Sequence, residues 1–431
     1  MKLRKWTAGL AALVLSASPT LAADENVGWS SDSLVRPASC DSGCDPCDCG
    51  DACHCGSGVG AAGLFSGIGP GIVEGFSLAG LLGLDDSGIE VGGWSQFGYH
   101  DLFEPLSSAA TGEGTGLTFN DVPQNLNMQQ QWFYLGRTAD GSNGLDVGFR
   151  GDFMYGTDAQ KTQAFGNPGA GVRNGGTFDA SLDHGVYGWA IPQLYGEVAM
   201  GDLAIKVGHF FTLVGYEVVN ATGNFFYSHA LTHFNSEPFT HTGVLTTYTG
   251  FEGMPLYNGW TAGWDTGFDN LNGGSNYLGG FAANLNDSVT FTYINTYGNF
   301  GLKDGGGEDS YMHSCVLTAG LTDKVNYVFE TDYLATDDIA QPTIDTIGIN
   351  QYLFYTYNDI VSFGSRIEWW KGAGPGGASP FGSRVSRYEY TSGANIKLLG
   401  NCVIRPEFRK DWVPAENFDQ DMWACDMILT Y

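Results

Sequence analysis

The sequence is poor in charged residues: Asp, Glu, Lys and Arg make up only 15% of its 431 positions. Helical proteins draw on a large stock of Glu, Lys and Ala, so this composition disfavours an all-helical fold. Basic residues are the scarcest, with 19 Lys and Arg against 47 Asp and Glu and a formal net charge of −28. Such a chain repels nucleic-acid backbones and offers no basic stripe for one to follow. Nucleic acid is therefore not an expected partner.

The sequence also lacks an apolar run that fits a membrane-spanning helix. The run from Trp6 to Leu15 is too short to cross a bilayer. Residues 63–84 are long enough, but Pro70, Glu74 and seven glycines argue against a helix in lipid. We interpret residues 63–87 as a Gly-rich apolar lead-in, a short helix or linker before the next domain.

The N-terminus has the pattern of an export signal. Lys2, Arg4 and Lys5 precede the short apolar run, and small residues follow it near Ala22. This order of basic, apolar and small residues is typical of a secretory signal peptide. We therefore expect residues 1–22 to be a signal peptide and the remaining chain to be exported.

Six of the nine cysteines lie within residues 40–55, inside a polar segment, 23–62, that we expect to be a Cys-rich periplasmic tail or linker. In an oxidising compartment, disulfides within the cluster or to another chain are the first interpretation. Metal binding through the thiolates and His54 is the second, although the spacings fit no standard four-ligand zinc pattern. The six candidates are Cys40, Cys44, Cys47, Cys49, Cys53 and Cys55.

Motifs for catalysis are missing as well. The sequence contains no phosphate-binding glycine loop between a strand and a helix, no nucleophile elbow and no credible catalytic triad. We therefore expect neither an enzyme nor a bound cofactor.

Glycine and aromatic residues are abundant, with 64 Gly and 14% aromatic residues, which suits tight turns and strand faces. From residue 88 to 431, apolar and polar residues alternate in short stretches separated by Gly, Asn and Asp. Most stretches reach the 9 to 11 or so residues that a tilted strand needs to cross a membrane. We count sixteen candidates, or 12 or 14 if the weakest are loops: 88–101, 126–139, 144–156, 193–201, 203–213, 241–250, 255–268, 275–286, 288–300, 309–322, 324–336, 343–358, 360–371, 386–399, 402–411 and 422–431.

The connections between these candidates alternate between short and long along nearly the whole chain. A transmembrane antiparallel up-and-down β-barrel with both termini in the periplasm has short turns at one rim and longer loops at the other. A β-sandwich or propeller gives no reason for this alternation. The sequence therefore predicts an all-β barrel of about sixteen strands over residues 88–431, in the bacterial outer membrane.

The charged residues within the candidate strands share one face with other polar residues. A charge facing lipid at the midplane costs about 2 to 4 kcal/mol, whereas a charge facing a wet lumen costs little. We therefore expect a charged lumen in which acidic and basic groups create a transverse field and filter solutes electrostatically. The predicted lumen charges are Arg150, Asp152, Lys206, Glu330, Asp332, Arg366, Glu368, Arg405, Glu407 and Arg409.

The chain ends within a strand pattern, on the aromatic residue Tyr431. A last strand that pairs with the first closes the barrel and leaves no exposed edge. An apolar strand with a terminal aromatic residue also resembles the signal by which outer-membrane proteins are recognised for insertion. The expected partners are thus the lipid bilayer and, through this strand, the barrel-assembly machinery.

The most distinctive segment runs from Gly208 to Leu245, GHFFTLVGYEVVNATGNFFYSHALTHFNSEPFTHTGVL. Here the sequence resembles the putative β-barrel porin family 2, the OmpL-like group, and the resemblance extends from about residue 65 to the end. It implies a porin-like barrel without catalysis. The family fixes no substrate or ligand residues, so none are transferred.

Within that segment, residues 214–240 form a long loop rich in aromatic residues, and loops of this length usually have a function. One hypothesis is a pore-constriction loop that folds into the lumen, where Glu217 and Glu237 create an acidic field. The alternative is a surface loop packed on its own aromatic residues. His229, His233 and Glu237 recur at spacings of four and are a weak candidate for a metal site on a helix. Histidine pairs in aromatic loops are more often packing groups, so no metal is predicted.

The function that these patterns predict is a porin through which small polar solutes or ions diffuse passively, with a preference for cations. Two rival classes stay open at this point, an outer-membrane barrel enzyme and a secreted β-rich adhesin or carbohydrate-binding protein. Further partners left open are a second copy of the chain, in a homo-oligomer, and an envelope component bound through the Cys-rich tail.

Overall fold

The computed structural model describes residues 77–84, 87–101, 119–120, 122–164, 179, 182–268, 274–301, 310–336, 344–372 and 384–431. The predicted signal peptide, the cysteine cluster and most of the lead-in lie outside these residues. The end of the lead-in contains the short helix α1, Leu78–Leu82, which begins after Ser77 and ends at Gly83 in a left-handed conformation.

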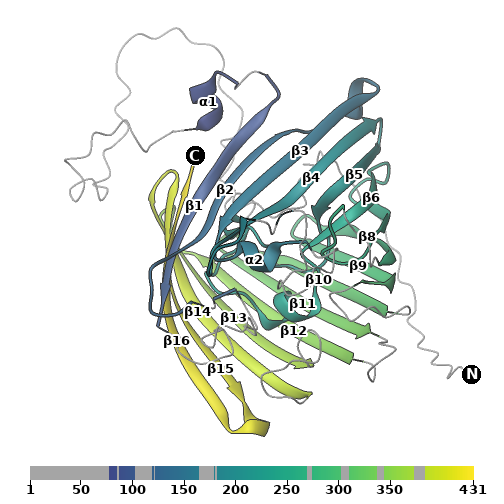
Figure 1. Cartoon of the computed structure of the whole chain (residues 1–431). Coiled ribbons are helices and arrows are strands. Elements are labelled where there is room, and N and C mark those ends of the chain that lie inside the picture. The colour runs from purple at the N-terminus through teal and green to yellow at the C-terminus, as the bar shows by residue number, and fades with distance from the viewer. Residues whose placement is uncertain are drawn as a thin grey trace, which may run out of the picture.

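Sixteen antiparallel strands form one closed barrel, in which each strand pairs with its neighbours in sequence and β1 pairs with β16. Figure 1 shows the purple strand β1 beside the yellow strand β16, where the barrel closes. The prediction of sixteen strands is confirmed, and the alternatives of 12 and 14 are excluded. The strands are β1 Glu90–His100, β2 Asn127–Arg137, β3 Asp146–Gly156, β4 Gly188–Met200, β5 Leu203–Phe211, β6 Thr240–Tyr248, β7 Leu256–Thr261, β8 Ser275–Asn286, β9 Val289–Asn299, β10 Ser310–Thr322, β11 Val325–Thr336, β12 Ile344–Thr356, β13 Val361–Gly372, β14 Val385–Leu399, β15 Cys402–Val413 and β16 Phe418–Thr430.

Helices contribute little to the fold. The described chain has two further short α-helices, α2 Ala159–Thr162 and α3 Leu231–Ser236, and the 3-10 turns η2 Gly141–Asn143, η4 Ala221–Gly223 and η7 Pro414–Glu416. None of the helices in the described residues is long and apolar enough to cross a membrane.

Three strand ends differ from the prediction by four residues or more. β4 begins at Gly188 instead of residue 193, because a register shift between Asp152 and Met154 of β3 makes room for Pro192, which cannot donate to the ladder. β7 stops at Thr261 instead of 268, because the chain then turns inward and buries Trp264. The connection between the last two strands, 412–421 by the candidate ranges 402–411 and 422–431, shortens to residues 414–417, so β16 begins earlier than expected.

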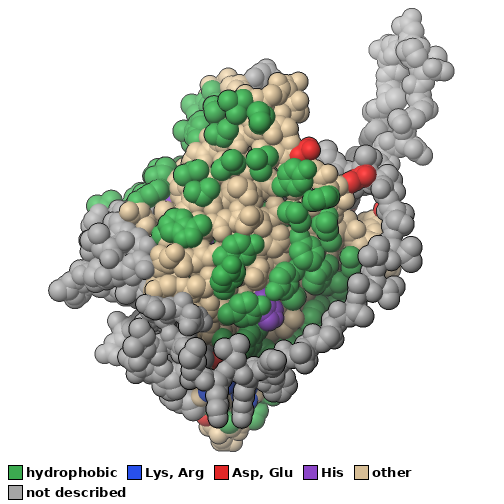
Figure 2. Space-filling view, turned by 90° about the vertical axis from the view of Figure 1, so that its right-hand side faces the viewer, with side chains coloured by type: hydrophobic (Ala, Val, Ile, Leu, Met, Phe, Trp, Pro, Cys, Tyr) green, Lys and Arg blue, Asp and Glu red, His purple; other side chains and the backbone are tan. Residues whose placement is uncertain are grey.

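The two faces of the strands differ as a barrel in lipid requires. Along β3, Val147, Phe149 and Phe153 are exposed on the outside, while Asp152 and Met154 on the other face are buried. Figure 2 shows hydrophobic side chains spread over the outer wall with few charged side chains among them. Lipid offers no hydrogen-bond partners, so the backbone N–H and C=O groups of the strands must pair within the barrel. The pairing of β1 with β16 leaves no open edge of the sheet.

Short and long connections lie at opposite rims. The turn between β4 and β5 consists of Gly201 and Asp202, and Gly201 adopts the positive φ of 58° that the turn needs. The N-terminal end of β1 and the C-terminal end of β16 share this short-turn rim. The longest fully described connection at the other rim joins β5 to β6, residues 212–239, and we call it the interior loop.

The outward position of Val244 on β6 leads to a prediction about stability. Val244, 37% exposed on the outer face at the middle of β6, should tolerate arginine poorly, because a cation facing lipid there costs about 2 to 4 kcal/mol. Thr247→Arg on the inner face of the same strand should cost little. Urea unfolding of both variants in lipid vesicles measures the difference. Equal losses for the two variants would contradict the assigned faces.

Candidate functional site: the barrel interior

The interior loop lies inside the barrel. Every residue from 212 to 239 is buried or half-buried, and its aromatic side chains pack on both sides of the interior. Phe239 belongs to a cluster with Trp132 of β2, whereas Phe225 and Phe226 pack on Phe354 of β12. Since the loop starts and ends on β5 and β6, it crosses the interior to reach β12.

Carboxylates of the opposite wall hold the backbone of the loop. Glu330 of β11 accepts a hydrogen bond from the Tyr216 N–H at 2.6 Å. Glu368 of β13 accepts from Leu231 and Thr232 N–H, both at 2.7 Å, at the first turn of α3. Glu407 of β15 accepts from Tyr227 N–H at 2.9 Å and from Ser228 N–H at 3.2 Å.

These bonds satisfy donors of an irregular segment that has no strand partner of its own.

Three arginines of the same wall hold the carbonyl groups of the loop. Arg366 of β13 donates to the Ser228 carbonyl at 2.9 Å, and Arg409 of β15 donates to the His229 carbonyl at 2.6 Å. Arg405 donates to the Asn224 carbonyl at 2.7 Å. Because each guanidinium also pairs with a wall carboxylate, the loop joins a network of buried charges.

The four residues predicted for the constriction loop all lie buried in this network. Glu217 pairs with Arg366 at 2.5 Å and with His229 Nδ1 at 3.1 Å. His233 Nδ1 lies 3.1 Å from Glu237. Burial alone would raise the pKa of Glu217, but the Arg366 guanidinium holds it well below its ordinary value. The negative charge of Glu217 is therefore largely offset by Arg366, which the sequence hypothesis of two field-setting glutamates did not foresee.

The weak metal candidate of the sequence is not assembled. His229 precedes α3, its ring stacks on His233 with centroids 4.9 Å apart, and the two imidazoles contact different carboxylates. In the described chain, the group of side chains close enough to hold one ion consists of Glu237, Glu330 and Asp332. The helical spacing was misleading because α3 covers only residues 231–236.

The ten predicted wall charges all lie on the inward side of their strands. Arg150 and Lys206 are half-buried near the short-turn rim, and the other eight are buried, with at most 4% of their surface exposed. The eight are Asp152, Glu330, Asp332, Arg366, Glu368, Arg405, Glu407 and Arg409.

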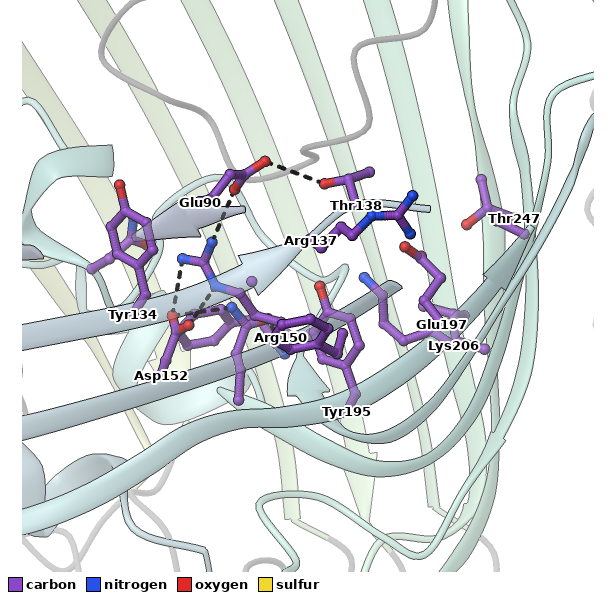
Figure 3. Close-up of a pocket in the computed structure, with 18 of the residues that line it drawn as sticks. Glu90, Tyr134, Arg137, Thr138, Arg150, Asp152, Tyr195, Glu197, Lys206 and Thr247 are labelled. Atoms are coloured by element: carbon purple, nitrogen blue, oxygen red, sulfur yellow. Dashed lines mark hydrogen bonds and ion pairs between the residues drawn. The ribbon is translucent and has the colours of Figure 1, made fainter. Parts of the chain in front are cut away.

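A cavity of about 360 Å³ opens between the interior loop and the inner faces of β1 to β7. Figure 3 shows its charged side chains, with Arg150 bridging Glu90 and Asp152. The Arg150 guanidinium lies 4.1 Å from the centre of the Tyr134 ring, and Lys206 Nζ lies 4.3 Å from that of Tyr195. We call this cavity the entry pocket. Tyr134 and Tyr195 were not among the predicted site residues. Their position on the strand face opposite the exposed apolar residues of β2 and β4 is a sequence signal that could have identified them.

A second cavity of about 360 Å³ lies on the other side of the interior loop, against β11 to β16. Asn224 and Phe225 of the loop form one side, and Asn326, Lys397 and Arg405 form part of the barrel wall. Thr222 of the loop lines both cavities. Space for water and solutes therefore lies on both sides of the loop.

The burial of His229 makes a pH prediction. Burial lowers its pKa from 6.5 to about 4, against the opposing hydrogen bond to Glu217. His229 of the unfolded chain binds a proton as the pH falls through 6.5, whereas His229 of the folded chain does not bind one until about pH 4. The free energy of unfolding therefore decreases as the pH falls from 6.5 to about 4. The loss amounts to about 3 kcal/mol. Urea unfolding across this range should show a flatter profile for His229→Asn, whereas the exposed His184→Asn should keep the wild-type slope.

A closed sixteen-stranded barrel with an apolar outer wall and an interior crossed by one long loop is the architecture of an outer-membrane porin. The chain belongs to the family described as "Putative beta-barrel porin-2, OmpL-like", whose model matches residues 88–424. It accordingly belongs in the bacterial outer membrane, with lipid around it.

Solved porins and channels have the same fold at very low sequence identity. An anion-selective porin from Comamonas acidovorans aligns with a TM-score of 0.54 and 10% identity over 80% of this chain and 99% of its own. The trimer form of OmpT, an outer membrane protein of Vibrio cholerae, gives 0.51 and 10% over 80% and 99%. The outer membrane channel DcaP of Acinetobacter baumannii gives 0.51 and 8% over 80% and 96%. No curated protein sequence matches the chain.

Proposed function

We propose that this chain is a passive channel for small polar solutes and ions. The main support for the proposal is the pair of cavities with charged side chains in their walls, on the two sides of the interior loop and inside a closed barrel of porin architecture. A packed structural barrel needs no such cavities, and the porin family supports diffusion over catalysis. The interior loop is the constriction, because it crosses from β5 and β6 to the wall at β11 to β15.

The proposed channel has a charged lumen and prefers cations. Among the described residues, thirteen acidic side chains and only five basic ones are buried. Glu217 is offset by Arg366, and burial together with neighbouring carboxylates raises the pKa of Glu237. The cation preference therefore arises from the acidic excess of the whole interior, with the two loop glutamates as minor contributors.

Assembly is a further part of the proposal. One of the similar solved structures is a trimer form, and large apolar side chains cover the outer wall of this barrel. We propose a homo-oligomer in the membrane, insertion guided by the last strand, and attachment to an envelope component through the Cys-rich tail. Chemical crosslinking in isolated membranes tests the first of these.

Two opposite charges in the entry pocket test the selectivity. Glu197 of β4 and Lys206 of β5 are paired in the strand register and line the same pocket. In planar bilayers under a KCl gradient, Glu197→Gln should lower the K⁺ over Cl⁻ permeability ratio and Lys206→Gln should raise it. The matched positions control for any loss of packing. Reversal potentials unchanged in both variants would contradict an electrostatic filter at this pocket.

A further inference from the structure

Three carboxylates from two different parts of the chain converge inside the barrel. Glu237 closes the interior loop just after α3, while Glu330 and Asp332 point inward from β11. An oxygen of each lies within 4.8 Å of an oxygen of the others, and all three residues are at most 1% exposed. The cluster therefore joins the loop to the barrel wall.

The other buried carboxylates of this wall are supplied with donors. Glu389 pairs with Arg366, and Glu368 and Glu407 accept N–H groups of the interior loop. Neither oxygen of Asp332 meets a hydrogen-bond donor of good geometry in the described chain, although the Glu237 carboxyl and the Ser314 hydroxyl face it. A fully buried carboxylate without donors is costly, so this position calls for a counter-charge.

Neutral oxygen atoms complete the surroundings. Ser314 of β10 stands opposite Asp332 in the strand register, is 1% exposed, and its hydroxyl makes no hydrogen bond of good geometry. Asn350 of β12, fully buried, donates its amide N–H to Glu330 at 2.9 Å and leaves its amide oxygen without a donor. The buried side chains around the cluster thus offer carboxylate, hydroxyl and amide oxygens.

This set of ligands matches calcium. Ca²⁺ takes six to eight oxygens at about 2.3 to 2.6 Å, so two oxygens on one ion are at most about 5 Å apart. The oxygens of the cluster lie within 4.8 Å of one another, which fits this span. Ca²⁺ also accepts the hydroxyl and amide oxygens beside the cluster as ligands, whereas Mg²⁺ usually keeps several waters and takes only one or two carboxylates. His233 contacts Glu237 through Nδ1, which orients the carboxylate.

We propose that Glu237, Glu330 and Asp332 form a Ca²⁺ site, completed by oxygens of Ser314 and Asn350, that fastens the interior loop to β11. Bound Ca²⁺ replaces the missing donors of Asp332 and offsets the repulsion among the three carboxylates. Removing calcium would then free Glu237 from β11, while the hydrogen bonds to Glu330, Glu368 and Glu407 still hold the rest of the loop.

The test measures Ca²⁺ binding directly. The full chain, refolded in detergent and stripped with EDTA, is titrated with CaCl₂ by calorimetry, and Tb³⁺ luminescence reports occupancy of the same site. We expect one specific equivalent in the wild type, weakened on the order of tenfold or more in Asp332→Asn. Asp152→Asn is the matched control, because it makes the same change at a buried carboxylate of β3 whose hydrogen bonds go to Trp132, Arg150 and Gln193, and it should bind Ca²⁺ as the wild type does.

Exposed carboxylates also bind calcium nonspecifically, so the test rests on the difference in Ca²⁺ affinity between the wild type and the variants. If Asp332→Asn does not fold, Ser314→Ala provides the second variant, with an affinity loss of several-fold. Binding that is equal in the wild type and both variants would assign the calcium to exposed carboxylates and overturn the site. If the wild type binds no Ca²⁺ specifically, protons shared among the three carboxylates must offset their charge, and the proposed Ca²⁺ site is overturned as well. No current is recorded, so this outcome is independent of the channel proposal.

Discussion

Replacing Arg366 with methionine is expected to destabilise the barrel by about 3 to 5 kcal/mol and to detach the interior loop from the wall. Arg366 is fully buried and pairs with Glu217 at 2.5 Å and with Glu389 at 2.8 Å. Its removal leaves two buried carboxylates without a counter-charge and removes the bond to the Ser228 carbonyl. Urea unfolding in vesicles measures the loss, and faster cleavage within residues 212–239 by an added protease reports the detached loop.

The control is an arginine of the same barrel that is only half-buried. Arg137 pairs with Asp146 at 3.0 Å near the short-turn rim, with 36% and 25% of the side chains exposed. Such pairs contribute about 0 to 1 kcal/mol, so Arg137→Met should unfold nearly as the wild type does. A small loss for Arg366→Met, or similar losses in both variants, would show that the buried network does not hold the loop.

Shortening the interior loop is expected to raise the single-channel conductance several-fold. Phe211 and Thr240 pair directly at the ends of β5 and β6, so a short Gly-Ser turn can replace residues 214–237 without breaking the sheet. The segment removed separates the two cavities, and without it they merge into one wide passage. Planar-bilayer recordings compare the variant with the wild type.

A matched insertion controls for changes in assembly. The same Gly-Ser segment inserted in the β8–β9 turn, residues 287–288 at the opposite rim and outside the lining of both cavities, should leave the conductance unchanged. An unchanged conductance after shortening the loop would mean that the interior loop does not limit the passage.

The barrel was predictable because its physical causes are local in sequence. The alternation of Val147, Phe149 and Phe153 with Arg150 and Asp152 reflects lipid on one side of β3 and polar surroundings on the other. Even so, Pro192 hid the start of β4, since the bulge that accommodates it depends on the register of the neighbouring strand.

The arrangement of the interior was not predictable, because its contacts join residues far apart in sequence. Glu217 meets Arg366 across 149 positions, and no spacing rule anticipates that pair. The spacing of His229, His233 and Glu237 suggested a helix face, yet Glu237 lies close to Glu330 and Asp332 of β11 instead. The sequence identified the inward residues, while their partners depend on how the loop crosses the barrel.

The most direct test of the channel is the single-channel current of the refolded wild-type protein in a planar bilayer. Folding is first established by heat-modifiable migration on a gel. We expect discrete steps of current that scale with KCl concentration and a reversal potential on the cation-selective side. A folded barrel that inserts into the bilayer and carries no current would contradict the channel proposal.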